Sequence, residues 1–429
     1  MATGLPSRIE KNAQKTIDEG FEITYKGKLD KEEVLLTTPS VDLTEIINVP
    51  GVYQNKLLYG DNLNLLKNLQ NDEDVIGKVK LIYIDPPYAT KSNFSSRKLE
   101  HAYTDTLSGS KYLEFLRQRL ILMKELLAED GSIYVHLDSN MAFPIKMIMD
   151  EVFGEQNFRN WITRKKCNPK NYTKKQYGNI SDYILFYSKT SNYIFNQPFT
   201  AWNEETSKKE YSYIEEGTGR RYKKVPIHAP GIRNGETGKE WRGMLPPPGK
   251  HWQYTPTRLE EMDKNGEIYW SATGNPRRKV YLENSKGIPV QDIWLDFKDA
   301  HNQNIKITGY PTEKNSDLLK QIILASSNTG DLVLDSFAGS GTTLAVAEEQ
   351  GRKWIGIDSS PLAIKTILKR LASGSEKMGD FVNKDLAESI QTQLFDNRIL
   401  RTGLSVSVDS NSLITNEHHV EEWKSILKD

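Results

Sequence analysis

Two short stretches of this 429-residue sequence combine side chains that could do chemistry with residues that fix the backbone. The first is residues 81–88, with the sequence Leu-Ile-Tyr-Ile-Asp-Pro-Pro-Tyr. Its apolar half is typical of a buried strand in a parallel sheet. The two prolines must end that strand, because proline donates no backbone N–H. Asp85 and Tyr88 are therefore predicted on a stiff loop at the carboxyl end of a strand, where open α/β sheets bind ligands.

This loop offers what an amino group on a planar heterocycle needs. The Asp85 carboxylate and the Pro86 carbonyl would accept its two N–H donors, while Pro87 stiffens the loop and the ring stacks on Tyr88. The alternative is an ordinary turn that ends a strand and carries a solvated aspartate. A four-residue pattern does not decide between these interpretations by itself.

The second stretch, residues 335–341 (Asp-Ser-Phe-Ala-Gly-Ser-Gly), joins the apolar segment Leu332–Asp335 to a predicted helix. Glycines let the backbone approach a ligand, and a helix start presents free N–H groups, so this architecture suits a nucleotide. It is neither a P-loop nor the full dinucleotide fingerprint. Asp358 ends the next predicted strand, the position from which an acid bonds a ribose hydroxyl. A lone Gly-x-Gly would equally fit a tight turn, but the combination predicts an adenosine-type cofactor. The candidate residues are Asp335, Phe337, Ala338, Gly339, Ser340, Gly341 and Asp358.

The elements around both stretches alternate between strands and helices, which predicts a doubly wound parallel α/β sheet. A strand over 56–61 runs into a helix that begins at Asn62, so Asp61 lies at a strand-to-helix turn, as a pocket residue or simply as a helix cap. Residues 89–110 are polar and aperiodic, typical of a mobile loop over the site. The other predicted helices are 112–129, 141–153, 316–327 and 361–371, and the other predicted strands are 132–137, 332–335 and 353–358.

The middle of the chain has a different composition. Residues 159–300 contain 25 Lys and Arg against 16 Asp and Glu, a net charge of +9, and six of the eight tryptophans, although the whole chain is neutral. Apolar strands such as 183–187 alternate there with Gly, Pro and Asn turns, so we predict an inserted β-rich domain. A basic, aromatic-rich block suggests nucleic acid as partner, with solvated lysines over an ordinary core as the alternative. Its candidate contacts are Lys165, Lys166, Lys174, Lys175, Arg220, Arg221, Arg277 and Arg278.

Composition excludes several classes. The lone Cys167 rules out an internal disulfide and a cysteine-based zinc site, and no metal-ligand cluster is evident, so no metal is expected. No apolar run is long enough to span a bilayer and no signal peptide is evident, which favours a cytoplasmic protein. Residues 1–50 and 373–429 look like a polar arm and a polar appendage without assignable chemistry.

Together these residues resemble the amino-methyltransferases that act on DNA and use S-adenosyl-L-methionine. Residues 84–88 look like their catalytic motif, residues 335–341 like their cofactor motif, and residues 310–314 (Tyr-Pro-Thr-Glu-Lys) like a further cofactor-binding segment. The order of catalytic motif, basic insert and cofactor motif is that of the β class. Residues 130–158 are similar to the modification (Mod) subunits of type III restriction systems.

The resemblance implies a circularly permuted Rossmann-like sheet with an inserted β-rich target recognition domain. The implied divisions are an arm at 1–50, the catalytic half at 51–158, the target recognition domain at 159–301, the cofactor half at 302–372 and an appendage at 373–429. The chain departs from the family pattern at Ala89, Asn315 and Ser336, where asparagine, proline and proline are usual.

The resemblance also implies a reaction, transfer of a methyl group to the N6 amine of an adenine flipped out of duplex DNA. Asp85, Pro86, Pro87 and Tyr88 would form the catalytic loop. Asp358 would hold the cofactor ribose, Asp61 its adenine end and Lys314 its carboxylate, with Thr312 beside them. A homodimer and a separate restriction subunit are expectations at the level of the family.

Two alternatives stay open. The same fold could methylate cytosine N4, RNA or a protein side-chain amide, although Asp85 favours adenine. A DNA-specificity subunit with an inactive methyltransferase core belongs to a different class, and the intact Asp85, Gly339 and Asp358 argue against it. No Walker A loop is present, which disfavours an ATP-driven nuclease within this chain.

Overall fold

The computed structural model describes residues 22–87, 93–95, 101–104, 109–169, 175–299, 306–307, 313–373, 376–377, 402–413 and 417–427. The chain divides into two compact units, which we call the insert unit (Gln197–Val290) and the core unit (the remainder). In the described parts of both units, no helix is long and apolar enough to cross a bilayer. No group of three or more His, Cys, Asp or Glu among these residues could hold a metal ion.

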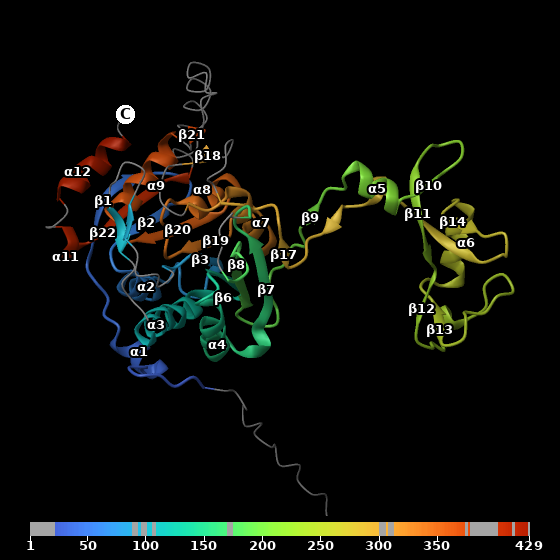
Figure 1. Ribbon diagram of the computed structural model, residues 1–429, viewed down its shortest axis with the longest axis horizontal. Coiled ribbons are helices and arrows are strands. Elements are labelled where there is room, and N and C mark those ends of the chain that lie inside the picture. The colour runs from blue at the N-terminus through green and yellow to red at the C-terminus, as the bar shows by residue number, and fades with distance from the viewer. Residues whose placement is uncertain are drawn as a thin grey trace, which may run out of the picture. The chain divides into compact units, whose positions relative to one another are not determined.

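One ten-stranded mixed sheet organises the core unit (Figure 1). In spatial order its strands are β1 (Leu43–Val49), β22 (Leu404–Asp409), β2 (Asn55–Tyr59), β20 (Lys353–Asp358), β19 (Leu332–Asp335), β3 (Val79–Ile84), β6 (Leu127–Leu137), β8 (Ser181–Ser188), β7 (Phe158–Lys165) and β17 (Ile293–Trp294). The strands from β2 to β6 run parallel, whereas β8 is antiparallel to both of its neighbours. The predicted α/β class is confirmed, with a sheet that is mixed rather than wholly parallel.

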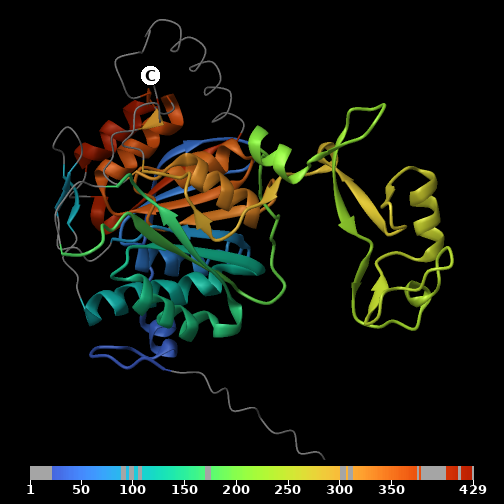
Figure 2. The ribbon, with the colours of Figure 1, turned by 45° about the vertical axis from the view of Figure 1, so that its right-hand side comes forward.

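Helices cover both faces of this sheet (Figure 1, Figure 2). One face carries α2 (Asn62–Gln70), α3 (Ser110–Leu126) and α4 (Ala142–Phe153), and the other carries α7 (Ser316–Ser326), α8 (Thr342–Glu349) and α9 (Pro361–Ser373). Helix α3 shows why: Leu116, Leu120 and Met123 recur at helical spacing and are completely buried. It ends three residues before the predicted limit, because Leu127 already begins β6.

The remaining elements of the core unit are short. They are α1 (Lys31–Thr37), β4 (Asn93–Ser95), β5 (His101–Thr104), η1 (Glu155–Asn157), β18 (Lys306–Ile307), β21 (Glu376–Lys377), α11 (Ser410–Leu413) and α12 (Glu417–Ile426). The predicted mobile loop at 89–110 lies mostly outside the described residues, apart from the paired strands β4 and β5.

The order of the strands along the chain is permuted relative to their order in space. β3 and β6, with the helices beside them, come first in the sequence, and β19 and β20 follow only after the insert unit. In the sheet, β3 and β19 are nevertheless direct neighbours. The loops that follow these two strands, which carry the two motifs, therefore start from the same edge.

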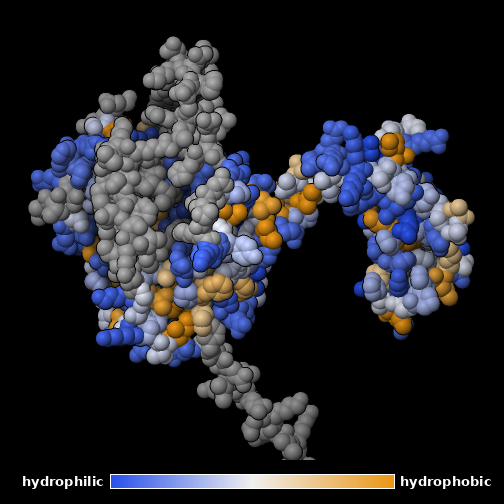
Figure 3. Space-filling view, in the orientation of Figure 1, coloured by the Kyte–Doolittle hydropathy of each residue, from blue (hydrophilic) through white to orange (hydrophobic). Residues whose placement is uncertain are grey.

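The insert unit is built on a small antiparallel sheet, in the order β10 (Tyr213–Ile214), β11 (Arg221–Pro226), β15 (Pro276–Tyr281) and β14 (Ile268–Trp270). Its own core contains Ile227, Trp241, Trp252, Leu259, Met262 and Ile268. Its other elements are β9 (Phe199–Thr200), α5 (Glu204–Glu210), β12 (His228–Pro230), η2 (Glu236–Gly238), β13 (Lys250–Trp252), α6 (Pro256–Lys264), η3 (Leu282–Asn284) and β16 (Ile288–Pro289). On the face seen in Figure 3, hydrophilic residues predominate, with small separate apolar spots.

The structural division differs from the predicted boundaries of the insert, 159 and 301. The insert unit begins at Gln197 and ends at Val290, so β7 and β8 belong to the core sheet. The segment 183–187, assigned from the sequence to the inserted domain, lies inside β8. Its unbroken apolar run reflects burial between β6 and β7, which the change of composition near residue 159 concealed.

The described parts of the predicted arm and appendage are more integrated into the core unit than the sequence suggests. β1, in the predicted arm, pairs with β22, in the predicted appendage, and β22 runs parallel to β2. Trp423 of α12 is completely buried, with its ring centroid 5.2 Å from that of Tyr59. These contacts are long-range in sequence, so local polarity did not reveal them.

Candidate active site

Three parallel strands bring acidic residues to one edge of the core sheet. Asp85 directly follows β3, Asp335 ends β19 and Asp358 ends β20. Because β19 pairs with both other strands, their carboxyl ends lie side by side. That edge is where open α/β sheets bind ligands.

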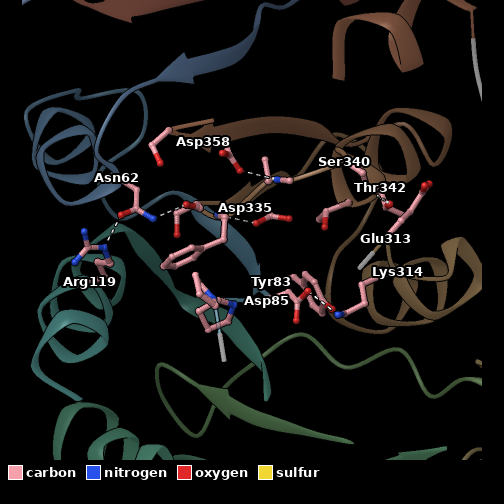
Figure 4. Close-up of a pocket in the computed structure, with 18 of the residues that line it drawn as sticks. Asn62, Tyr83, Asp85, Arg119, Glu313, Lys314, Asp335, Ser340, Thr342 and Asp358 are labelled. Atoms are coloured by element: carbon pink, nitrogen blue, oxygen red, sulfur yellow. Dashed lines mark hydrogen bonds and ion pairs between the residues drawn. The ribbon is translucent and has the colours of Figure 1, made fainter. Parts of the chain in front are cut away.

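A pocket of about 400 Å³ opens between these strand ends (Figure 4). Of the residues predicted from the sequence, it is lined by Asp61, Asp85, Pro86, Pro87, Lys314, Asp335, Phe337, Ala338, Gly339, Ser340 and Asp358. Gly341 lies at the N-cap of α8, and Tyr88 and Thr312 lie outside the described residues. We call residues 85–88 the proline loop and residues 335–341 the glycine loop. Described residues of both loops line the same cavity.

The glycine loop is held in a tight conformation. The Gly339 N–H donates to Asp358 Oδ2 at 2.8 Å, and the Phe337 N–H donates to Asp335 Oδ1 at 3.0 Å. Gly341 has φ +73°, and a Cβ there would lie 2.7 Å from Ile367 Cγ1. A side chain at this position would be strained and would push the loop away from α9. The loop can thus place backbone N–H groups against a ligand.

Asp61 both caps a helix and lines the pocket. Its Oδ1 accepts from the Leu63 N–H at 2.9 Å at the start of α2, as an N-cap should. The same oxygen pairs with Arg119 Nη2 at 2.7 Å. The Arg119 guanidinium in turn lies 3.6 Å from the centroid of the Phe115 ring. The capping and ligand-binding interpretations of Asp61 are therefore compatible.

Sequence reasoning missed Arg119, which lines the pocket and is 4 % exposed. Burial lowers its pKa to about 10, against the opposing effect of Asp61. A signal was present, because Arg119 follows Leu116 by three residues and therefore sits on the apolar face of α3. A buried cation on such a face needs an anionic partner. Asn62 and Phe115 were missed as well and carried no comparable signal, whereas Glu313 lies within the predicted cofactor-binding segment 310–314 but was not singled out.

The pocket is acidic. Five carboxyl groups line it (Asp61, Asp85, Glu313, Asp335 and Asp358), against the two cations Lys314 and Arg119. Burial raises the pKa of Asp335 to about 7, and the charges of Asp85 and Asp358 contribute. Burial also raises the pKa of Asp358, although backbone N–H groups of Ser360 and Gly339 oppose the effect. Such a field favours a ligand that carries positive charge.

The raised pKa of Asp335 predicts how its replacement affects stability. In the folded protein this carboxyl holds its proton up to about pH 7, whereas unfolded it would ionise near pH 4. The resulting cost to stability therefore grows between about pH 4 and pH 7 and is complete above pH 7, where it is on the order of 2–4 kcal/mol. We expect Asp335→Asn to raise the unfolding temperature of the ligand-free protein at pH 8 and to raise it less at pH 5. Thermal unfolding followed by circular dichroism at both pH values is the measurement, and a larger gain at pH 5 would contradict the assignment.

Lys314 connects the two sides of the pocket. Its Nζ lies 2.7 Å from Asp85 Oδ2, and the two side chains are only 10 % and 19 % exposed. The preceding residue, Glu313, forms an ion pair with Arg370 of α9. The segment 313–314 is thereby tied to the cofactor half of the sheet while its lysine reaches the proline loop.

A buried polar chain lies behind the proline loop. The Tyr83 hydroxyl is 2.8 Å from His136 Nδ1, and His136 Nε2 is 3.0 Å from Asp182 Oδ2, which also pairs with Arg164 at 3.0 Å. Burial alone would raise the pKa of Asp182, but His136 and Arg164 outweigh it and hold that pKa well below its usual range. This chain fixes the end of β3, from which Asp85 projects.

The predicted basic residues fall in separate places. Lys165 ends β7, Lys166 follows it and Lys175 is exposed, while Lys174 lies outside the described residues. In the insert unit, Arg220 pairs with Glu283 and stacks 3.7 Å from the Tyr281 ring centroid. The other predicted arginines of this unit are Arg221 on β11 and Arg277 and Arg278 on β15.

Comparison with known proteins gives concordant results. A family model described as DNA methylase (N6_N4_Mtase) matches residues 79–369. The type II methyltransferase M.EcaI of Enterobacter cloacae is 46 % identical over 420 residues, which cover 95 % of this chain and 91 % of that protein.

More distant relatives extend the picture. The StyLTI Mod subunit, a type III restriction-modification enzyme of Salmonella typhimurium, is 29 % identical over 79 % of this chain and 58 % of its own length. The DNA adenine methyltransferase YhdJ of Escherichia coli is 29 % identical over 73 % of this chain and 82 % of its own length. The chain thus spans little more than half of the Mod subunit but most of the other two relatives. It belongs to the DNA methylase family, as the motifs predicted, and is a methyltransferase of the restriction-modification type that uses S-adenosyl-L-methionine.

Proposed function

We propose that this protein is a site-specific methyltransferase that modifies the N6 amine of adenine in duplex DNA. The observation that carries the proposal is the position of Asp85. Its carboxylate follows β3, is stiffened by Pro86 and Pro87, and opens into the same pocket as the glycine loop. The DNA adenine methyltransferase YhdJ among the relatives supports adenine over cytosine.

The residues present fit the cofactor that the family implies. When bound, S-adenosyl-L-methionine supplies an electrophilic methyl group on a positively charged sulfonium. The acidic pocket favours such a cation, and the tight glycine loop allows the backbone to approach an adenosine. We assign the ribose to Asp358, the adenine end to Asp61 and the carboxylate to Lys314, with Thr312 as a further contact.

The proline loop would activate the target amine. The lone pair of that nitrogen is delocalised into the ring, which makes it a weak nucleophile. Asp85 and the Pro86 carbonyl would accept its two hydrogens and favour a tetrahedral nitrogen, and alignment within the pocket would supply much of the remaining effect. A base inside a duplex is out of reach, so the adenine must be flipped out at a cost of a few kcal/mol. Stacking on Tyr88 would return roughly 1–3 kcal/mol of that cost.

One face of the sheet in the insert unit is suited to DNA. We call it the tyrosine face, and it consists of Tyr213, Tyr222, Lys224, Tyr269, Arg277, Lys279 and Tyr281, which strand alternation and pairing place on the same side. Lys224 Nζ lies 3.6 Å from the Tyr213 ring centroid and 3.4 Å from that of Tyr269. The ammonium is thus held in place by aromatic rings, and Arg277 beside it is exposed.

The opposite face of that sheet is occupied by the core of the insert unit. Ile268 packs there with Leu259 and Met262 of α6. Arg278 donates to the Tyr254 hydroxyl, and Arg221 Nη1 donates to the Tyr211 carbonyl at 3.4 Å. Of the arginines predicted to bind DNA, we therefore propose Arg277 and Arg220 as DNA contacts and a structural role for the other two. Lys165, Lys166, Lys174 and Lys175 stay proposed contacts.

Removing cations from the tyrosine face should weaken DNA binding in a salt-dependent way. The double variant Lys224→Ala/Arg277→Ala is expected to reduce the slope of log affinity against log salt by about two, because each phosphate contact releases about one counterion. Fluorescence anisotropy with a duplex between 50 and 200 mM salt measures this slope. Lys264→Ala, on the exposed side of α6, is the matched control. Equal slopes for the double variant and wild type would argue against this face.

Partners follow from the reaction. Duplex DNA is the proposed substrate, and a DNA substrate supports a cytoplasmic location. A homodimer and a separate restriction subunit are proposed on the family resemblance. Sedimentation of the purified protein with and without DNA tests the dimer, and a single monomeric species under both conditions would reject it.

Expression in a bacterial strain that lacks its own DNA methyltransferases tests the function. Long-read sequencing of the chromosome should reveal N6-methyladenine within one recurring sequence, which is then the recognition site. N4-methylcytosine would establish the alternative acceptor. An unmodified chromosome, together with normal cofactor binding by the purified protein, would point to a specificity subunit or to RNA.

A further inference from the structure

The ammonium group of Lys314 lies where the two halves of the pocket meet. It pairs with Asp85 Oδ2 at 2.7 Å and lines the cavity that also contains Asp335 and Asp358 (Figure 4). Both partners are largely withdrawn from water, so their attraction is stronger than that of a surface ion pair.

The backbone that carries Lys314 is anchored on both sides. Glu313 pairs with Arg370, whose Nη1 donates to Thr342 Oγ1 at the start of α8 at 2.6 Å. Asn315 caps α7 by accepting from the Asp317 N–H at 2.8 Å, and its Nδ2 donates to the Lys298 carbonyl at 3.2 Å. The flexible four-carbon stem of the lysine is therefore the part that can move.

The proposed chemistry makes two demands on this ammonium group. Asp85 needs its oxygens for the N6 amine, yet one of them faces Lys314. The carboxylate of the cofactor is assigned to Lys314 as well. A second carboxylate on the same ammonium would divide its charge and weaken its hold on Asp85.

We propose that Lys314 is a positioning residue that couples the cofactor site to the target-base site. Without cofactor, Lys314 engages Asp85 and disfavours binding of the flipped adenine. With cofactor, Lys314 turns toward the cofactor carboxylate and leaves Asp85 to accept the amine. This inference rests on the proposed function and adds cooperative binding to it. Binding of the cofactor raises the affinity of the site for the flipped adenine, and binding of the adenine raises the affinity for the cofactor. Couplings of this kind are typically about 5- to 150-fold.

The experiment measures base extrusion rather than turnover. A duplex with the recognition site found by sequencing carries fluorescent 2-aminopurine next to the target adenine, which keeps its own 6-amino group. Extrusion is measured with wild-type protein in the absence of ligand, with S-adenosylhomocysteine, and with methylthioadenosine. Methylthioadenosine has the adenosine and the sulfur but lacks the amino-acid end with its carboxylate and ammonium groups. We expect S-adenosylhomocysteine to raise the equilibrium constant for extrusion of the target adenine about tenfold. Methylthioadenosine should leave this equilibrium constant unchanged.

Two variants complete the design. Lys314→Met removes the charge and keeps the length of the stem, so extrusion without cofactor should already match that of wild type with S-adenosylhomocysteine. Its affinity for S-adenosylhomocysteine should fall roughly tenfold, since one charged contact is lost. Its affinity for methylthioadenosine should stay unchanged, which also shows that the pocket is folded. Lys320→Met, at an exposed position of α7, is the control and should behave like wild type.

The outcomes separate this inference from the function on which it rests. If N6-methyladenine forms but both ligands affect extrusion equally, or if Lys314→Met keeps the coupling of wild type, the role of Lys314 is rejected and the function stands. If no N6-methyladenine forms, no target adenine exists, and both the function and the role of Lys314 are rejected. Coupling that requires the carboxylate and disappears in Lys314→Met supports the proposal.

Discussion

Asp85→Ala should reduce methyl transfer to DNA by roughly 10³-fold, the cost of removing a group aimed at charge that develops in a transition state. Cofactor affinity should not fall and should rise modestly, because Asp85 lies on the target side of the pocket and its removal releases Lys314 for the cofactor carboxylate. Single-turnover methylation measures the first quantity and titration calorimetry the second.

Two controls sharpen this expectation. Asp85→Asn keeps the shape and one acceptor oxygen but replaces the other with a donor, so its rate should also be low. Asp74→Ala removes a carboxylate whose side chain is 95 % exposed, and it should methylate like wild type. A rate within tenfold of wild type for Asp85→Ala would show that another group activates the amine.

The second large effect concerns Asp358, which we expect to bond the ribose hydroxyls. Asp358→Ala should weaken cofactor binding by about 3 kcal/mol, roughly 100-fold in Kd, because hydrogen bonds to a charged acceptor are lost. S-adenosylmethionine and S-adenosylhomocysteine should be affected alike, since both carry the same ribose. Calorimetric titration with each ligand measures the change.

Asp358 also accepts from the backbone N–H groups of Gly339 and Ser360, so the alanine variant removes support from the glycine loop. Asp358→Asn keeps one acceptor oxygen for that loop and serves as the companion variant. If the asparagine variant binds the cofactor as wild type does, the ribose is held elsewhere.

The sequence predicted those elements of the site whose structure depends on residues close together in the chain. Residues 81–84 of β3 and 332–334 of β19 are apolar runs that lead into an acid. Two prolines directly follow the first acid, and two glycines follow the second within six residues. Both features act within about ten residues. Strand, loop and position at the sheet edge could therefore be assigned before the pairing of β3 with β19 was known.

The remainder depends on contacts between distant segments. The ion pair of Lys314 with Asp85 and that of Arg119 with Asp61 each join parts of the chain that no local pattern connects. The same holds for β22, a strand of the predicted appendage that pairs between β1 and β2. Composition suggested a solvated tail there, whereas pairing across the sheet decides the structure.

The register of the insert sheet was likewise not evident from the sequence. Arg277 and Arg278 are adjacent, so strand alternation must send them to opposite faces. The sequence alone does not say which face is open. The packing of Ile268 against α6 settles that question, because Ile268 is directly opposite Arg278.

The most direct test of the central claim uses S-adenosylmethionine with a radiolabelled methyl group and unmethylated genomic DNA. After incubation with the wild-type protein or with Asp85→Ala, the DNA is digested and its nucleosides are separated. The account predicts label in N6-methyladenine for wild type and only background for the variant. Label in N4-methylcytosine, or equal label from the Asp85→Ala protein, would contradict it.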